Sequence, residues 1–454
     1  MTTATAPSYA ATAAHAAEDK HPKGLYVLFA TEMWERFSFY SMLAMFTLYL
    51  QDPTQGFGWT AAQATSLYAN YLMFVYASPL IGGWIADKKL GYRRAVMLGG
   101  VFFMAGHLLL SVRSIPIVYL ALTCLVIGNG FFKPNVSAMV GNLYPEGSHL
   151  KDRAYNIFYM GINIGAFLAP VVMEIVSQRW GYHPAFALAA FGMLISVSIL
   201  WKFKKHVEQA DRGRVASMRG TKAAQTAAVT ADAPPMGAAR RTAIDEISDA
   251  KRIGALIVIY LVVIVFWMVF HQNGSTLTYW ADNNTDWEVS GVISNAINPF
   301  WVVSLTFPLV WFWKWLDSKG KEPSTPTKMA IGMCLTGLSF GVLYLAAING
   351  GDEGVRMSPA WLIGAYAVLT LGELMLSPMG LALVSKVAPQ RMRGLMMGGW
   401  FVATAIGNKL TMIGVYWEVW KHSTFFLVLG SMALAMAVVL ALLLRPLKRA
   451  MPGV

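Results

Sequence analysis

The chain has 454 residues, of which 56% are hydrophobic and only 13% are charged, and its mean hydropathy is +0.49. Because a soluble domain carries roughly 25% charged residues, this composition excludes an ordinary soluble protein and indicates a membrane protein. The net charge of +12 lies mostly in short loops between apolar stretches, so no nucleic-acid partner is implied. The two cysteines, Cys124 and Cys334, both lie in apolar stretches, and neither a disulfide nor a metal site is expected.

Residues 1–22 are polar and rich in alanine and threonine, without the apolar segment of a signal peptide, and we expect a disordered cytoplasmic tail. Twelve apolar stretches of about 20 residues or more follow, each long enough as a helix to cross a hydrocarbon core of roughly 30 Å. Six lie in residues 23–203 and six in residues 254–446. The polar segment 204–253 is interpreted as a flexible cytoplasmic linker, and residues 447–454 as a short cytoplasmic tail. The predicted fold class is an all-α membrane protein with twelve transmembrane helices in two six-helix bundles.

Lysine and arginine residues are distributed unequally between the short loops. If the N-terminus is cytoplasmic, the inner loops hold thirteen of them and the outer loops hold four. Since cytoplasmic loops retain positive charge, we predict that both termini are cytoplasmic. We expect a multi-pass protein of the lipid bilayer of a bacterial inner (plasma) membrane, and a eukaryotic membrane is also compatible with the sequence.

Three charged residues interrupt the first apolar stretch. Glu32, Glu35 and Arg36 are spaced i, i+3, i+4, which places them on one face of a helix, and Tyr40 extends that face by one turn. Each charge would cost roughly 2.5–3.5 kcal/mol if it faced lipid, so the three must face a polar interior. The other ionisable residues deep within predicted spans are His107, Lys133, His271, Glu373 and Lys409.

Helix length indicates the depth of these residues. At about 1.5 Å per residue from the nearest cytoplasmic helix end, Glu35 and Lys133 lie at roughly 15 Å, and Asn163 and Glu373 at roughly 14 and 20 Å. They therefore fall in one layer, as a carrier with a central polar site requires. The two glutamates of the first span, Arg36 and Lys133 sum to zero charge, so they can be buried without a counter-ion. Glu373 has no cation beside it and is a candidate proton carrier or receptor for a substrate cation.

The segment EMWERFSFY, which begins at Glu32, resembles the ExxERFxYY signature of the proton-dependent oligopeptide transporter (POT) family, within the major facilitator superfamily. The segment GGWIADKKLGYRR, from Gly82 to Arg94, is similar to the superfamily's loop between its second and third helices. Further segments resemble family signatures in the same order along the chain: GNGFFKPN (128–135), FYMGINIGA (158–166), FHQNGSTL (from 270), INP (297–299), GELMLSP (from 372) and MGGWF (from 397). The resemblance implies the major facilitator superfamily fold.

Two features depart from the family pattern. Phe39 stands where the pattern has the first tyrosine of its pair, so a hydroxyl contact assigned to that position is absent, whereas Tyr40 retains the second tyrosine. Many bacterial members carry two extra helices between the bundles, but residues 202–252 are too polar to form them. We therefore expect twelve spans rather than fourteen.

The resemblance also implies a function. Members of the family use a proton gradient to import di- and tripeptides by alternating access, and they are secondary active transporters rather than enzymes. By motif position, Arg36 and Lys133 would bind the peptide carboxylate, and Glu373 would bind the peptide amine with help from Asn163 and Asn298. Aromatic side chains that would line the binding site are Tyr40, Tyr76, Trp267 and Trp400.

Proton coupling requires a group whose protonation alters an ion pair. Our hypothesis is that Glu35 pairs with Lys133 in the empty site, and that protonation of Glu32 and Glu35 frees the cations for the peptide. Glu373 is the third candidate for proton coupling. The loop after the second span is interpreted as a conformational element that stabilises one state by helix caps and salt bridges. Its residues are Gly83, Asp87, Gly91, Arg93 and Arg94.

Two other functions, anion transport and membrane-bound catalysis, fit the sequence less well than peptide transport. A proton-coupled carrier of nitrate or another small anion is the closest alternative, because Arg36 and Lys133 alone suit an anion, but an anion gains nothing from Glu373. A membrane enzyme is disfavoured because the sequence contains no HExxH, GxSxG or paired Cys/His motif, and we expect no catalytic residue, metal or cofactor. The sequence assigns no role to His271 or Lys409, and a monomer is the working expectation.

Overall fold

The computed structural model describes residues 20–144, 150–211, 247–389 and 392–451. Twelve of its helices have 18 or more residues. Six of these lie in the N-terminal half: α2 (Lys23–Gln51), α3 (Ala61–Ile85), α4 (Tyr92–Leu110), α5 (Ile115–Asn142), α6 (Leu150–Trp180) and α7 (Tyr182–Lys202). Six lie in the C-terminal half: α9 (Asp249–Phe270), α11 (Ile297–Ser318), α12 (Thr325–Ile348), α13 (Pro359–Val387), α14 (Arg393–Leu410) and α15 (His422–Ala450).

These twelve helices agree with the predicted fold class. Nine helices in the described residues satisfy both the length and the hydropathy of a membrane span. The other three are α2, α3 and α14: α2 carries a cluster of buried charges, and the other two contain polar residues such as Asn70 and Asn408. Apart from one isolated bridge between Thr285 and Met357, the described ranges contain no β-structure.

Short helical turns interrupt three spans of the C-terminal half. After α9 come η4 (His271–Gly274) and α10 (Thr276–Asn283), before α11 comes η5 (Gly291–Ala296), and after α14 comes η8 (Thr411–Tyr416). Irregular backbone is tolerated within a membrane only where it is buried in protein or lines a polar space. The break at His271 is buried, so this part of the span lies inside the protein.

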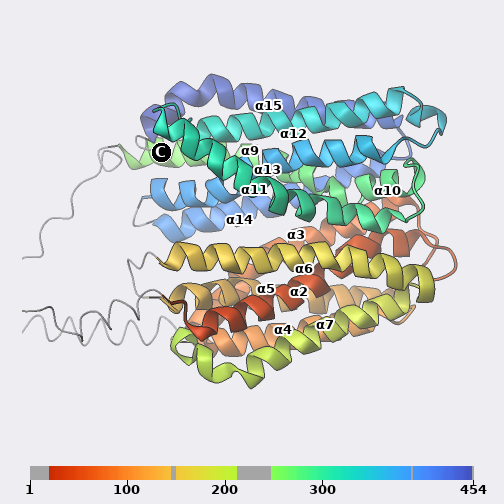
Figure 1. Cartoon of the computed structure of the whole chain (residues 1–454), viewed down its shortest axis with the longest axis horizontal. Coiled ribbons are helices and arrows are strands. Elements are labelled where there is room, and N and C mark those ends of the chain that lie inside the picture. Colours follow the sequence, from red (N-terminus) through yellow and green to blue (C-terminus); the bar gives the residue numbers. More distant parts are fainter. Residues whose placement is uncertain (1–19, 145–149, 212–246, 390–391, 452–454) are drawn as a thin grey trace, which may run out of the picture.

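Figure 1 shows the long helices side by side along the long axis of the molecule. Helices of the N-terminal half occupy the lower part of the view and those of the C-terminal half the upper part. Within the halves, α2 packs on α6 and α7, and α12 packs on α13 and α15. The first described residues and the C-terminus lie at one end of the bundle, here called the terminal end, and the opposite end is called the distal end (Figure 1).

The first residues of the expected linker are helical and packed. Lys204–Asp211 form a 3-10 helix, η2, in which Val207 and Ala210 are buried. Asp211 accepts a hydrogen bond from the backbone N–H of Arg93 at 2.7 Å and pairs with its guanidinium Nε at 3.4 Å. Polar composition alone did not distinguish this packed segment from a flexible one.

The element boundaries differ from the expected ones at three places. η2 occupies the start of the expected linker, α9 begins at Asp249, and α15 continues to Ala450. Residues 1–19, 212–246 and 452–454, which belong to the expected tails and linker, lie outside the described residues. Their predicted roles remain predictions.

One close helix contact depends on glycine. Gly82 of α3 lies against Gly130 of α5, and a Cβ at Gly82 would overlap the carbonyl group of Gly130. Small residues at helix contacts of this kind let two membrane helices pack closely. The contact holds α3 and α5 together, and these two helices carry Tyr76 and Lys133.

Hydrogen bonds that join the two halves, within the described ranges, all lie toward the distal end. Their partners are Thr47 with Gly274, Ala61 with Glu418, Thr65 with Tyr279, Ser66 with Met412, Asn70 with Lys409, and Glu174 with Ser290. Among the helix contacts between the halves, α3 packs on η8 and α6 packs on η5 at this end, and α3 also packs on α14. The structure therefore represents a state in which the distal end is closed by direct contacts between the halves.

Candidate functional site

The charges of α2 form one buried cluster. The guanidinium of Arg36 donates from Nε and Nη2 to the two carboxylate oxygens of Glu35, at 2.5 and 2.7 Å, and its Nε lies 3.1 Å from Glu32 Oε1. All three side chains are at least 97% buried. Buried charges need paired and hydrogen-bonded partners, and the three residues, which the sequence placed on one helix face, supply them to one another within about one turn.

Lys133 does not join this cluster by a salt bridge. Its ammonium lies 4.6 Å from the ring centroid of Tyr76, a cation–π contact, and no carboxylate of the described residues lies within 4.0 Å of it. The expected Glu35–Lys133 pair is therefore absent from this structure. In its place, the planar fork of Arg36 engages both oxygens of Glu35.

Glu373 lies in the other half, on α13. Its Oε2 accepts a hydrogen bond from Asn298 Nδ2 at 2.8 Å, and the same amide nitrogen also donates to Thr370 Oγ1 at 3.0 Å. In the part of the chain that the structure describes, no lysine or arginine pairs with this carboxylate. The structure thus brings Asn298 and Glu373 together, and Glu373 stays available for a cation.

Tyrosine hydroxyls connect the two halves of the site. The charges of Arg36 and Glu373 both act on Tyr40 and on Tyr76, and Glu373 also acts on Tyr159. Tyr40 and Tyr76 are therefore near both the cluster of the N-terminal half and the carboxylate of the C-terminal half. Such an arrangement can bind a ligand with one negative and one positive end.

Two residues of this region were not found from the sequence. Tyr159 lies one turn before Asn163 on α6, and its carbonyl oxygen accepts a hydrogen bond from Asn163 Nδ2 at 2.9 Å. Thr370 lies three residues before Glu373 on α13 and shares Asn298 with it. Tyr159 lies four residues from Asn163, and Thr370 lies three residues from Glu373. Each therefore shares a helix face with a predicted site residue, and this spacing could have identified it from the sequence.

The aromatic candidates divide into two groups. Tyr76 packs against Trp267 with ring centroids 6.4 Å apart, so this pair spans the two halves. Trp400 is buried against Gly380 of α13, where a Cβ would overlap its indole ring. No described contact joins Trp400 to the charged residues, so its predicted place in the binding site remains a prediction.

The residues predicted to form a conformational loop lie at the terminal end. Asp87 accepts a hydrogen bond from the hydroxyl of Tyr92 at 2.8 Å, and Gly91 has a φ of 76°, a conformation that favours glycine. The ion pairs of Arg93 are made with η2, through Asp211 at 3.4 Å and Glu208 at 4.0 Å. The remaining loop residues are Gly83, which faces Pro134, and Arg94, which is exposed.

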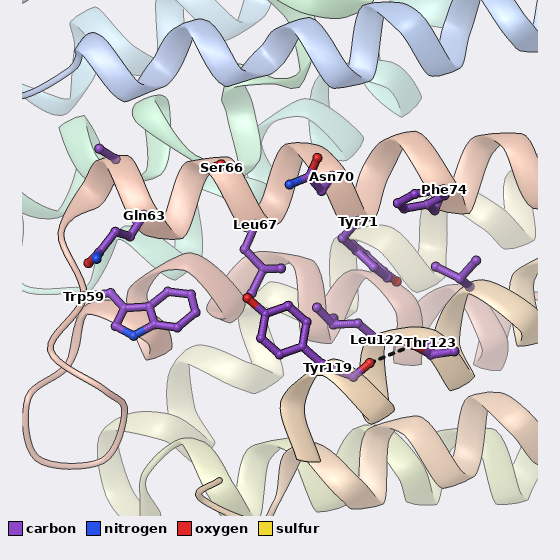
Figure 2. A pocket seen from close by; sticks show the side chains of 12 residues that line it. Trp59, Gln63, Ser66, Leu67, Asn70, Tyr71, Phe74, Tyr119, Leu122 and Thr123 are labelled. Atoms are coloured by element: carbon purple, nitrogen blue, oxygen red, sulfur yellow. Dashed lines mark hydrogen bonds between the residues drawn. The ribbon is translucent and has the colours of Figure 1, made fainter. Parts of the chain in front are cut away.

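A groove of about 1040 Å³ lies between α3 and α5, outside this site (Figure 2). None of its lining residues is charged, and Phe74 and Tyr119 on its walls are more than half exposed. The charged residues of the α2 cluster therefore do not line the groove. Asn70 of the groove accepts a hydrogen bond from Lys409 Nζ, so this lysine contacts the opposite bundle, whereas the sequence assigned it no role.

Comparisons with known proteins agree with this fold. The chain matches the model of the POT family over residues 93–231 and 212–428. A di-/tripeptide transporter of Lactococcus lactis subsp. lactis (strain IL1403) is 29% identical, over 95% of this chain and 97% of its own length. Dipeptide and tripeptide permease A of Escherichia coli (strain K12) is 30% identical, over 87% of this chain and 84% of its own length.

A solved structure supports the same assignment. The crystal structure of a POT peptide transporter in complex with sulfate is 30% identical to this chain, has a TM-score of 0.83, and covers 95% of this chain and 96% of that one. The fold, the family model and relatives that align over most of their length agree, and the resemblance seen in the sequence is confirmed. This chain belongs to the POT family of multi-pass membrane transporters.

Proposed function

We propose that this protein is a proton-coupled symporter that imports di- and tripeptides. The observation that carries the proposal is the placement of charge: Arg36 and Lys133 lie in one half, and Glu373 lies in the other. A free peptide is a zwitterion, so both of its ends find a complementary charge. The substrates in the names of the similar transporters support the same class.

The binding roles follow from which groups are already paired. Lys133 has no described carboxylate partner, so it is the first cation available to the peptide carboxylate. Arg36 is held by its two glutamates and becomes available only when they release it. At the other end, Glu373 receives the peptide ammonium, positioned by Asn298.

The observed pairing supports a role of the cluster on α2 in proton coupling. A proton on Glu35 removes the charge that holds Arg36 most closely, and a proton on Glu32 removes the second contact. The freed guanidinium can then turn to the peptide carboxylate, which links proton uptake to substrate binding. In this proposal the glutamates release Arg36 when they are protonated, whereas Lys133 makes no ion pair with either glutamate before or after protonation.

Alternating access supplies the transport step. Direct contacts between the halves close the distal end in this structure, and we propose that the site exchanges with solution at the terminal end. We propose that the terminal end is cytoplasmic, as the distribution of positive charge predicts, and that this state is the inward-facing one. A monomer contains all of the proposed binding residues.

The test is uptake of labelled dialanine into liposomes that contain the purified protein, with and without an inward proton gradient. The wild-type protein should concentrate dialanine, and a protonophore should abolish this accumulation. Glu35→Gln should lose gradient-driven accumulation of dialanine. It should still exchange dialanine inside the liposome for dialanine outside, because this counterflow needs no proton gradient. Glu288→Gln, at an exposed glutamate of a distal loop, is the matched control and should behave as wild type. Concentrative uptake by Glu35→Gln would contradict the coupling role.

The same liposomes test the alternative function. Nitrate or another small anion would use Lys133 and Arg36 but not Glu373, so Glu373→Gln should leave anion uptake intact. For a peptide carrier, Glu373→Gln should abolish dipeptide uptake. Gradient-driven nitrate accumulation without peptide uptake would replace the peptide proposal.

A further inference from the structure

Two adjoining hollows lie on the surface of the N-terminal half. One, of about 260 Å³, lies between α2, α6 and α7, and the other, of about 380 Å³, lies along the last turns of α7. Phe191 and Ile195 line both hollows, so the two form one continuous groove, here named the α7 groove. Phe191 and Leu194 on its walls are about half exposed. In a membrane-spanning bundle, such a groove opens toward the lipid.

One face of α7 runs along the whole groove. Leu188, Phe191, Ile195, Ile199 and Lys202 follow one another at intervals of three or four residues, which places them in one row on the helix. From Leu188 to Lys202 the row extends about 21 Å, at about 1.5 Å per residue. Half of a bilayer, headgroups included, is about 20–22 Å thick. The groove therefore matches the length of one leaflet, and its lysine lies at the level of the headgroups.

The inner part of the groove is apolar. All ten residues that line the hollow between α2, α6 and α7 are apolar. Gly165 and Gly192 bring α6 and α7 close to α2, because a Cβ at Gly165 would overlap the carbonyl oxygen of Met33, and a Cβ at Gly192 would overlap the ring of Phe37. The hydrocarbon core of a bilayer holds no water, so an acyl chain fills this hollow.

The outer part of the groove is basic. Lys202 lines it, Lys204 follows two residues later, and the two ammonium groups each lie 5.7 Å from the ring centroid of an exposed aromatic side chain. The acidic residues of η2, Glu208 and Asp211, pair with Arg93. Within the described ranges, neither lysine has a carboxylate within 4.0 Å. The positive charge at this end of the groove thus remains without a counter-charge from the described chain.

We propose that the α7 groove binds one anionic phospholipid, with an acyl chain in its apolar part and the phosphate at Lys202 and Lys204. Basic residues that directly follow a membrane helix attract anionic headgroups in this way. A zwitterionic phospholipid offers the same acyl chains, but the cation of its headgroup offsets the attraction of its phosphate to the lysines. The lipid site is independent of the transported substrate. Its acyl chain contacts α2 at Met33 and Trp34, on the helical turn that carries the charged cluster.

The experiment is native mass spectrometry of the purified full-length protein in detergent with equal amounts of phosphatidylglycerol and phosphatidylcholine that have identical acyl chains. Wild-type protein should retain one phosphatidylglycerol in preference to phosphatidylcholine. One lysine near an anionic lipid changes its affinity by about fivefold. Lys202→Gln should therefore lower the preference for phosphatidylglycerol by about that factor, and the double variant Lys202→Gln/Lys204→Gln should lower it further.

Control variants separate the headgroup from the acyl chain. Lys319→Gln is the matched control for the lysines, because the ammonium of Lys319 also lies over an aromatic ring, that of Trp315, but lines neither hollow. It should keep the wild-type preference. Ile195→Trp fills the groove where its two hollows meet, and it should reduce retention of both lipids. Val438→Trp, at an exposed position of α15, should reduce neither.

The same spectra contain the results that would overturn the proposal. Equal retention of the two lipids by wild-type protein would show that the groove does not select an anionic headgroup. An unchanged preference in the double lysine variant would place the anionic lipid elsewhere on the protein. A protein dimer that Ile195→Trp dissociates would show that a second copy of the chain, and not a lipid, occupies the groove.

Discussion

The contact between Glu174 and Ser290 provides a direct test of how the distal end closes. Glu174 is a buried carboxylate of α6, and it accepts hydrogen bonds from both the backbone N–H of Ser290, at 2.7 Å, and the Ser290 hydroxyl. The two residues belong to different halves, so both bonds must break when the distal end opens. Replacement of Glu174 by alanine should therefore favour the state that is open at that end.

The size of the effect follows from the type of bond. A hydrogen bond to a charged group contributes roughly 1.5–3 kcal/mol net, and water replaces part of both bonds in the open state. We take about 2 kcal/mol for the pair, which corresponds to about a 30-fold shift of the equilibrium between closed and open distal ends. Because the same bonds hardly affect folding within each half, thermal stability should change little.

The assay is a distance measurement between spin labels in liposomes. Labels at Val112 and Glu353, which are exposed near the distal end in different halves, report its opening after both native cysteines are replaced by serine. Glu174→Ala should shift the distance distribution toward longer values. Glu288→Ala, at an exposed carboxylate two residues from Ser290, should not. Identical distributions for wild type and Glu174→Ala would refute the idea that this contact holds the distal end closed.

Two further predictions concern stability. Gly82→Ala should strongly destabilise the protein, since the new methyl group would overlap the α5 backbone, and overpacking typically costs about 1–3 kcal/mol. Gly341→Ala, where a Cβ meets no atom within 4 Å, should instead stabilise the helix by about 0.5–1 kcal/mol. Thermal unfolding in detergent distinguishes the two variants. Equal unfolding midpoints would contradict the packing argument. Asp211→Ala should remove the cap on α4 and cost about 1 kcal/mol. Glu208→Ala, at an exposed carboxylate 4.0 Å from the Arg93 guanidinium, should cost almost nothing. Equal losses for the two variants would show that the Asp211 cap on α4 is not what stabilises this contact.

Some structural features were predictable from the sequence because they depend on local spacing. The number of spans follows from apolar length, and the shared face of Glu32, Glu35 and Arg36 follows from helix geometry. The isolation of Glu373 from cations was also expected, since no lysine or arginine lies near it in the sequence. Helix-by-helix counting placed Lys133 at the depth of the α2 cluster but gave no information on where its side chain points.

The sequence by itself determined the class of protein, the fold and the buried charges, because hydropathy and helical period are properties of neighbouring residues. Tertiary structure alone decided the partners of those charges. Arg36 pairs with Glu35, while Lys133 lies over Tyr76, because the rotation of each helix about its axis is set by packing against other helices. The contact of Tyr76 with His271 joins residues 195 positions apart, and no local pattern specifies an encounter at that separation.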